Sequence, residues 1–410
     1  MRSEESQPRP DGASTPGADT PVGWRGAFVL FGVLFVGVSD TQLIPPLLPL
    51  MAQDLGISPG RAGLVVTFYA LAAATFALLL GTASDRLGRK RLIAMALVTF
   101  ALASLLTSRS DYFSTLLGAR LLTGLAAGTL STLALSYAAD LYPYERRGRA
   151  MGILSMAYFL AFVIGIPAGA VIATSFGWRW VFVGIAVATT FVFFLTTTIL
   201  PPDRNRKAVP VLATLGTHFR SRDRLAGIAA AFLTSGGLVG FITYVGVWLD
   251  SQNVGTREIG LLLMTAGVGA TVASPISEWL SDHIGKRNVV IGANLALAPA
   301  FVITARIQWG GGLFVAVCLL AVIASTRQAP LHALTTELVG DQQRGSYVAV
   351  RNAASQLGIA VIASLAALAY DRSGFEATAW ISATATLLLV PVCALIREPR
   401  APDDPRQENA

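Results

Sequence analysis

Apolar residues follow one another in long blocks along this chain, and short polar segments separate the blocks. The blocks lie near 26–50, 62–82, 91–108, 113–139, 150–173, 178–200, 226–249, 258–280, 288–306, 312–337, 347–370 and 377–396. Each block is long enough to cross about 30 Å of hydrocarbon as a helix that rises about 1.5 Å per residue. The pattern predicts an all-α membrane protein with twelve transmembrane helices.

The polar segments between the blocks repeat at a constant distance. Four residue pairs recur at an offset of 197 (282 − 85), namely Asp85 and Asp282, Gly88 and Gly285, Asp140 and Glu337, and Arg147 and Arg344. Such a repeat predicts two six-helix pseudo-repeats around a central cavity. We expect a disordered cytoplasmic tail over 1–23, a six-helix half over 24–200, a cytoplasmic linker over 201–225, a second half over 226–397 and a tail over 398–410.

Composition and charge support a membrane location. Of the 410 residues 53% are hydrophobic and only 13% are charged, about half the charged share of a soluble domain. The net charge of +7 does not indicate nucleic-acid binding, because 16 Lys and Arg residues fall in alternate loops and the opposite loops hold six. This asymmetry predicts that both termini are cytoplasmic. The plasma (inner) membrane is the expected location, with the lipid bilayer as partner.

Several chemistries have no signal in the sequence. His and Cys do not occur at the spacing of metal ligands, and the phosphate loop of nucleotide-driven pumps is absent. We therefore expect no cofactor, no metal and no enzymatic activity, which argues against a membrane enzyme or a sensor. An ion gradient remains as the energy source of a transporter.

Four segments together resemble a known family. The segment 81–91 joins the second and third spans, 120–128 reads Arg-Leu-Leu-Thr-Gly-Leu-Ala-Ala-Gly, 165–169 reads Gly-Ile-Pro-Ala-Gly, and 176–180 reads Phe-Gly-Trp-Arg-Trp. These residues are similar to motifs of the major facilitator superfamily, and of its twelve-helix drug:proton antiporter branch. In that branch Thr123 is often Gln, and Gly-Pro is usually contiguous where Ile166 intervenes here. The Gly-x-Pro form resembles sugar- and nucleoside-efflux members.

The resemblance, which covers about residues 24–397, implies a function. It implies proton-coupled efflux of small organic molecules, drugs or metabolites, by alternating access in a protein that works as a monomer. The alternative within transport is an importer or uniporter of an organic anion or sugar. The expected partners are therefore a small-molecule substrate and protons, and no nucleic acid.

Asp40 and Arg120 are the expected proton-coupling residues. Asp40 is the one acidic residue placed well inside a predicted span. Counting from the predicted helix ends puts both residues about 21 Å from the inner boundary, and the resemblance places their helices on the central cavity. An isolated carboxylate there takes up a proton or needs a cation. The alternative is a static pair that only packs two helices.

A cytoplasmic gate is the second expected site. Gly81 and Gly88 permit close approach and a tight turn, and Asp85, Arg89 and Asp140 lie near helix ends. The resemblance implies that this network closes the cytoplasmic side of the outward-facing state. The offset of 197 predicts a weaker copy from Asp282, Gly285, Lys286 and Glu337, because lysine cannot form a bidentate contact. Alternatively, these charges only set topology.

The remaining candidates concern the cavity and the contact between halves. Arg327 lies within the tenth span without an acid at its depth, which favours an acid-bearing substrate unless the side chain snorkels to phosphates or binds a carbonyl. Tyr244 is the expected aromatic lining residue. Gly165, Pro167 and Gly169, the antiporter motif by resemblance, should form a groove and a kink that meets Gly260 and Gly267 of the eighth span.

Overall fold

The computed structural model describes residues 23–202 and 216–396, apart from the side chains of residues 79–87, 144, 145, 274, 341, 342 and 344. Within these ranges the regular structure is helical and strands are absent. Ten helices are long and apolar enough to cross a membrane, or eleven with the bent α11. The long α15 folds back on itself and supplies one span more, so the prediction of an all-α membrane protein with twelve spans is confirmed.

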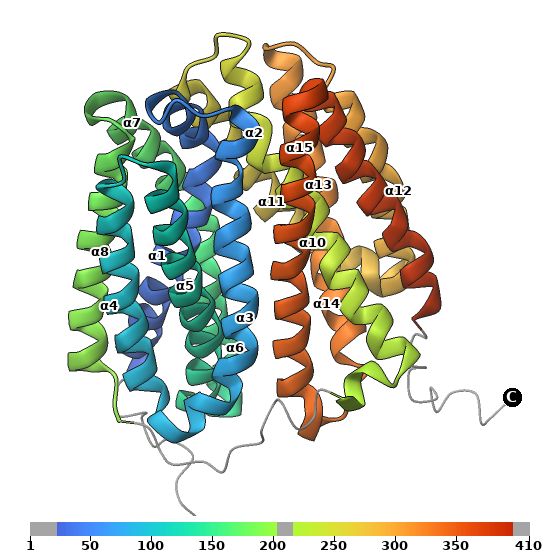
Figure 1. Ribbon diagram of the computed structural model, residues 1–410. Coiled ribbons are helices and arrows are strands. Elements are labelled where there is room, and N and C mark those ends of the chain that lie inside the picture. Colours follow the sequence, from blue (N-terminus) through green and yellow to red (C-terminus); the bar gives the residue numbers. More distant parts are fainter. Residues whose placement is uncertain (1–22, 203–215, 397–410) are drawn as a thin grey trace, which may run out of the picture.

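The N-terminal half contains the first six spans (Figure 1). Its elements are α1 (Gly23–Asp54), α2 (Pro59–Ala62), α3 (Leu64–Leu87), α4 (Arg89–Ser108), α5 (Phe113–Leu141), α6 (Tyr144–Leu160), the π-helical turn η1 (Ala161–Gly165), α7 (Ile166–Phe176) and α8 (Trp178–Ile199). The short α2 continues into α3 as the second span, and α6, η1 and α7 together form the fifth.

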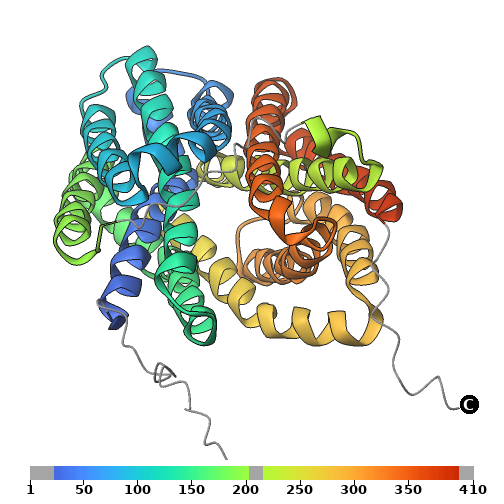
Figure 2. The same cartoon turned by 90° about the horizontal axis from the view of Figure 1, so that it is seen from below.

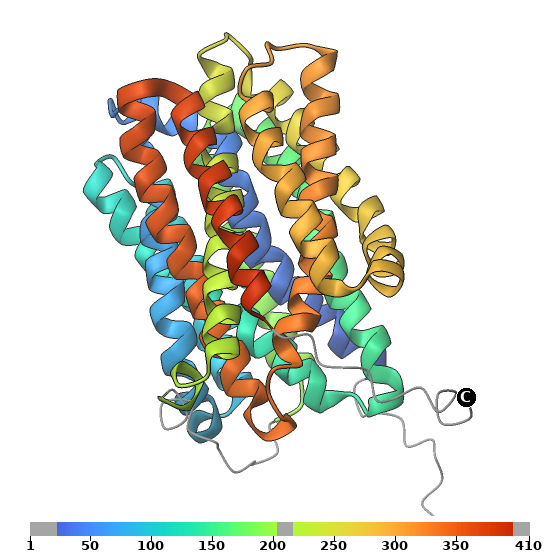
Figure 3. The same cartoon turned by 90° about the vertical axis from the view of Figure 1, so that its right-hand side faces the viewer.

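The C-terminal half contains the other six spans. Its elements are α10 (Arg222–Asp250), α11 (Thr256–Ile284), α12 (Lys286–Thr304), α13 (Gly311–Thr326), α14 (Gln328–Thr336) and α15 (Asp341–Leu395). The 55 residues of α15 would reach about 80 Å as one helix. Instead Gly374, with φ of 73°, reverses the direction, and the two arms run side by side in Figure 3.

The two halves repeat each other in turn geometry as well as in sequence. Left-handed backbone conformations occur at Gly56 and Asn253, at Gly88 and Gly285, and at Gly177 and Gly374. Each pair differs by 197 residues (253 − 56, 285 − 88, 374 − 177). Because a left-handed residue ends a helix and redirects the chain, the same bends recur in both halves. The predicted duplication therefore extends to the turns.

The two bundles lie side by side, as the view along the helices shows (Figure 2). We call the face where α1 begins and α15 ends the termini face, and the opposite face, which holds Gly56, Gly177 and Gly374, the loop face. Side chains exposed on the bundle exterior are largely apolar, for example Met95 and Leu102 of α4 and Phe191 of α8. Such a surface suits lipid rather than water.

Prolines bend several spans and leave carbonyl groups without a helical partner. Pro330 has no N–H for the carbonyl of Thr326, four residues earlier, and the Ser277 hydroxyl of α11 donates to this carbonyl at 2.6 Å. The carbonyl of Pro45 is left free by Pro49 in the same way, and it lies so close to Gly246 of α10 that a Cβ there would be 1.9 Å away. The α11 helix bends by 43° before Pro275, and its inner end turns sideways in Figure 3.

Close packing of α5 on α3 gives a first prediction. A Cβ at Gly124 would lie 2.1 Å from the Tyr69 carbonyl oxygen, whereas a Cβ at Gly118 of the same helix meets nothing within 4 Å. Gly124→Ala should therefore destabilise the protein by about 1–3 kcal/mol through overpacking. Gly118→Ala should keep or raise stability, since alanine is the better helix former. Melting temperatures in detergent compare the two, and equal values would contradict the close contact.

Candidate functional site

A salt bridge between α1 and α5 lies at the centre of the N-terminal half. Arg120 donates from Nη1 to Asp40 Oδ1 at 3.0 Å and from Nη2 to Asp40 Oδ2 at 2.8 Å. Both side chains are buried, with at most 1% of their surface exposed. This bidentate geometry is the strongest form of a carboxylate–guanidinium contact. The contact that the matched depths predict is therefore present.

Neighbouring side chains hold this ion pair in place. The ring of Tyr69, on α3, lies 5.1 Å from the Arg120 guanidinium carbon and forms a cation–π contact. Thr123, where the resembling branch often has glutamine, donates its hydroxyl to the Ala119 carbonyl of its own helix at 2.9 Å. The Nε of Arg120 and the hydroxyl of the adjacent Ser39 are buried without a partner among the described residues. Two polar groups beside the ion pair are thus available for further hydrogen bonds.

The burial of the pair determines what it can do chemically. Removing one partner of a buried ion pair costs about 3–5 kcal/mol, because the other charge is left unpaired. A carboxylate that loses its cation in a low-dielectric site gains affinity for a proton. A movement that separates α1 from α5 would therefore leave two buried charges without their partners.

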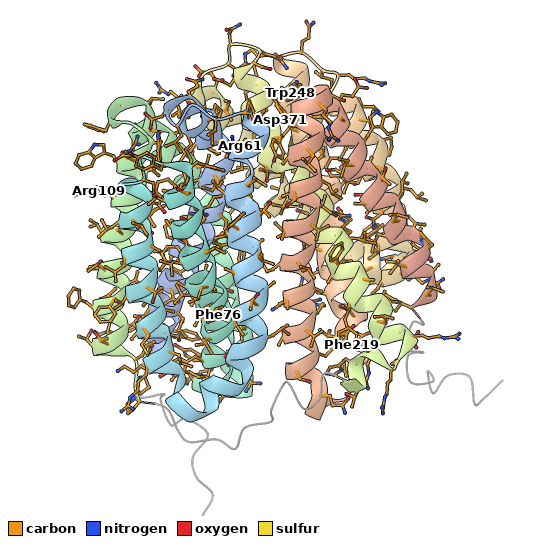
Figure 4. The ribbon with its side chains drawn as sticks, viewed as in Figure 1. Arg61, Phe76, Arg109, Phe219, Trp248 and Asp371 are labelled. Carbon is orange, nitrogen blue, oxygen red and sulfur yellow. The ribbon has the colours of Figure 1, made fainter. Side chains whose placement is uncertain are left out.

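On the loop face, hydrogen bonds join the two halves. The Asp371 carboxylate accepts from the Ser58 hydroxyl at 2.7 Å and from the Gly60 backbone N–H at 2.8 Å. Tyr244 donates to the Gly60 carbonyl at 3.2 Å, and the hydroxyls of Thr67 and Ser364 lie 3.1 Å apart. Figure 4 shows Asp371, Arg61 and Trp248 at this end of the bundle. We call these contacts, together with Gln53–Asp250, the loop-face closure.

The contact between Gln53 and Asp250 locates the axis that relates the halves. The amide of Gln53 donates to Asp250 Oδ2 at 3.1 Å, and the two residues are 197 positions apart. Equivalent residues touch each other only where a two-fold axis passes between them. The axis of the repeat therefore passes through the loop-face closure, and the structure is a conformation closed on the loop face.

On the termini face, the expected gate residues form ion pairs within each half. Arg89 of α4 is ion-paired with Asp140 of α5 and donates to the Ser136 carbonyl at 2.8 Å. The equivalent Lys286 of α12 is ion-paired with Glu337, just after α14. Arg89 thus binds two acceptors, and Lys286 binds one among the described residues. Neither pair joins the two halves in this conformation.

The other gate residues have different outcomes. Gly88 and Gly285 have φ of 83° and 85° and precede α4 and α12, so the expected tight turns are present. Asp282 is exposed and pairs with no basic side chain among the described residues. It therefore does not take part in the expected second network in this conformation. Gly81 and Asp85 belong to the segment 79–87, whose side-chain surroundings lie outside the described residues.

The segment with Gly165, Pro167 and Gly169 contacts two neighbours. The π-helical turn η1 ends at Gly165, two residues before Pro167, so the regular helix is interrupted where the sequence predicts a kink. A Cβ at Gly169 would lie 2.0 Å from Leu43 of α1, so this glycine faces α1 within the same half. Contact with α11 of the other half is made at Gly260, whose Cβ would lie 3.0 Å from Ala170. A Cβ at Gly267 of α11 would likewise lie 2.3 Å from Phe162 of η1, so the segment meets α11 through Phe162 and Ala170 while Gly169 faces α1.

Arg327 and Tyr244 are both fully buried and bound to other residues of the protein. Arg327 is fully buried; it donates to the amide oxygen of Asn294 and, at 3.2 Å, to the Thr234 carbonyl. It binds a carbonyl, as one of the alternatives held. Tyr244 is also fully buried and stacks on Tyr370 at 5.2 Å. It belongs to the loop-face closure, so the expectation that it lines the cavity does not describe this conformation.

Two polar residues of interest are not apparent from the sequence. Arg351 is buried inside the eleventh span and donates to Thr335 at 3.0 Å and to His332 Nδ1. In the sequence, Arg351 belongs to a helical stripe of polar or small residues with Ser355 and Gly358. This stripe could have indicated a polar face of the span. Asp371 lies directly after the span, where it resembles an ordinary loop residue. Its partner Gly60 is 311 positions away, and nothing local indicates that contact.

The two repeated helical bundles, with a charge pair buried between helices and a closure on one face, define a membrane carrier. The chain matches the family model described as Major Facilitator Superfamily over residues 29–257 and 249–410. It belongs to the major facilitator superfamily, whose members are carriers and not enzymes.

Relatives and solved structures agree with this assignment. The purine ribonucleoside efflux pump NepI of Escherichia coli (strain K12) is 32% identical over 320 residues, 74% of this chain and 76% of that protein. The uncharacterized MFS-type transporter YtbD of Bacillus subtilis (strain 168) is 26% identical over 378 residues, 87% of this chain and 91% of that protein.

The fold is similar to that of solved transporters. The crystal structure of a D-xylose-proton symporter aligns with a TM-score of 0.75 at 17% identity, over 92% of this chain and 98% of that one. The structure of the nucleoside transporter NupG aligns with a TM-score of 0.75 at 14% identity, over 91% of this chain and all of that one, 100%. At these identities the likeness concerns the fold alone.

The ion pair gives a prediction about stability. Asp40→Asn leaves a buried guanidinium unpaired and should lower the free energy of unfolding by about 3–5 kcal/mol. The double variant Asp40→Asn/Arg120→Gln removes both charges and should recover most of the loss. Thermal unfolding in detergent of the two single variants and the double variant measures the coupling. Additive losses would contradict a direct interaction.

The loop-face closure gives a prediction about conformation. Asp371→Ala removes two hydrogen bonds between the halves, and a loss of about 1.4 kcal/mol would change the ratio of conformations tenfold. Spin labels at Arg109 and Arg306, which occupy equivalent loop-face positions, should then report a larger population at long distance. Arg372→Ala, one residue further on, is the matched control and should leave the distances unchanged. Identical distributions in both variants would exclude a role of Asp371 in closure.

Proposed function

We propose that the protein exports small organic molecules, drugs or metabolites, in exchange for protons. The observation that carries this proposal is the buried Asp40–Arg120 pair, which couples one titratable carboxylate to the relative position of two helices. Protonation weakens the pair, and separation of the helices raises proton affinity. One elementary charge moved across 100 mV is worth about 2.3 kcal/mol, which corresponds to a concentration ratio of about fifty.

Alternating access is the proposed mechanism. With the termini face in the cytoplasm, as the distribution of Lys and Arg favours, the described conformation is closed toward the outside. Opening to the outside would break the loop-face closure and bring the termini-face ends of the halves together. The segments of Arg89 and Lys286 would then meet the opposite half, and each ion pair keeps its own segment in position for that contact.

The relatives suggest which substrates to test first. NepI is by name an efflux pump for purine ribonucleosides, which makes nucleosides the first metabolites to test here. The alternative is import or uniport of an organic anion or sugar, and a D-xylose-proton symporter shows that the same fold can serve that direction. For either direction of transport we propose that the protein works as a monomer in the plasma membrane.

Proton coupling is tested in proteoliposomes with an imposed pH gradient. Uphill transport of tritiated inosine, ethidium and benzoate is measured for the wild type and for Asp40→Asn. The substitution should abolish gradient-driven accumulation, because the amide cannot exchange a proton, while counterflow exchange of the accepted substrate persists. Asp111→Asn is the matched control, since this carboxylate lies at the surface with 80% of its side chain exposed.

Two further measurements test the direction of transport and the proton coupling independently. Accumulation in vesicles that are acidic inside indicates export-type exchange, whereas accumulation with acidic medium outside indicates symport and would favour the alternative. Full coupling in Asp40→Asn would exclude this carboxylate as the proton carrier.

A further inference from the structure

A small polar cavity lies between α10, α14 and α15 of the C-terminal half. Its volume is about 20 Å³, enough for roughly one water-sized group. Its polar lining comes from Thr234 and Ser235 of α10, Gln328, His332 and Thr335 of α14, and Arg351 and Ser355 of α15. We call this cavity the C-half pocket. It is separate from the Asp40–Arg120 pair, which lies in the other half.

The C-half pocket presents hydrogen-bond donors. Arg351 is 6% exposed and its Nε has no partner among the described residues. Because arginine only donates, its contact with His332 Nδ1 makes that nitrogen the acceptor, and the neutral ring then carries its proton on Nε2. The hydroxyl of Thr234 is also buried and unpartnered in the described chain. These groups are suited to a ligand atom that accepts hydrogen bonds.

The charge around the C-half pocket is positive and uncompensated. Arg351 and the nearby Arg327 are both buried, and no carboxylate of the described residues is ion-paired with either. Arg327 uses neutral oxygens of Asn294 and Thr234. Buried cations without a counter-charge are costly and mark substrate or ion paths in membrane proteins. An anionic ligand would supply the missing charge.

The internal repeat shows that the fold itself does not require this cluster. At an offset of 197 the positions of Arg327, His332 and Arg351 correspond to Leu130, Leu135 and Leu154 (327 − 197, 332 − 197, 351 − 197). The same scaffold is thus built with apolar residues in the N-terminal half. Conversely, Asp40 and Arg120 correspond to Gly237 and Val317 (40 + 197, 120 + 197). Each half carries a separate polar group of its own.

We infer that the C-half pocket binds the acidic group of the transported substrate, with Arg351 as the cation and His332, Gln328 and Thr234 as further donors. The volume suits one oxygen atom of a carboxylate or phosphate, so the rest of the molecule would lie outside the pocket. This inference rests on the proposed transport function and narrows its substrates to organic acids. Arg327 keeps its protein partners and contributes charge without direct contact.

The test uses the purified full-length protein in detergent and follows its melting temperature. Benzoate, benzamide and chloride are the probes: an organic acid, its neutral isostere and an inorganic anion. Benzoate should raise the melting temperature by about 2–4 °C, benzamide should have no effect, and chloride should give less than half the rise. In Arg351→Gln the benzoate effect should disappear, whereas Arg351→Lys, which keeps the charge, should retain part of it.

The protein without probe distinguishes a binding residue from a structural one. Removing an uncompensated buried cation should leave the melting temperature of Arg351→Gln equal to or above that of the wild type. A clear fall would assign Arg351 to the scaffold and overturn the inference. A rise that chloride reproduces in full would also overturn it, because the ligand would then be a free inorganic anion.

A failure of the proposed proton coupling can be distinguished from a failure of the acid site. Asp40→Asn should keep the full benzoate effect, since the pair lies in the other half. If Asp40→Asn keeps both coupling and the benzoate effect, the acid site stands and the coupling proposal falls. If the wild type has no benzoate response, the acid site falls whatever the coupling assay gives.

Discussion

A charge inside a membrane protein has to be matched by the protein itself, because lipid offers no partner. The two halves meet this constraint in different ways. In the N-terminal half Asp40 and Arg120 neutralise each other with two hydrogen bonds. In the C-terminal half Arg327 and Arg351 are held by neutral groups only. One half therefore contains a charge pair that compensates itself, and the other contains buried positive charge without a carboxylate partner among the described residues.

The backbone obeys the same constraint. Each proline in a span frees one carbonyl, and a free carbonyl in hydrocarbon costs several kcal/mol. Ser277 satisfies the carbonyl of Thr326 from a neighbouring helix, and the glycine at 246 lets α10 approach the carbonyl of Pro45. The bends are thus fixed by partners on other helices. The first of these contacts lies within the C-terminal half, and the second joins α10 to α1 of the other half.

Much of this architecture could be predicted from the sequence, and the reasons are local or periodic. Long apolar blocks gave the spans, and the offset of 197 residues located equivalent turns. Matched depth brought Asp40 to Arg120, because depth in a bilayer is a coordinate that counting along a helix can supply. Counting cannot supply rotation about the helix axis. For that reason Tyr244 was placed in the cavity, the contacts of Gly165 and Gly169 with α1 were not foreseen, and Arg351 and Asp371 were missed.

The strength of the loop-face closure fits reversible opening. Among the described residues, five hydrogen bonds cross between the halves. At about 0.5–1.5 kcal/mol each, they contribute a few kcal/mol in total. A conformational equilibrium that ligands and protons can shift has to lie within that range. A rotation of one half against the other that breaks these hydrogen bonds would open the loop face. The ion pairs of Arg89 and Lys286 would move with their own halves.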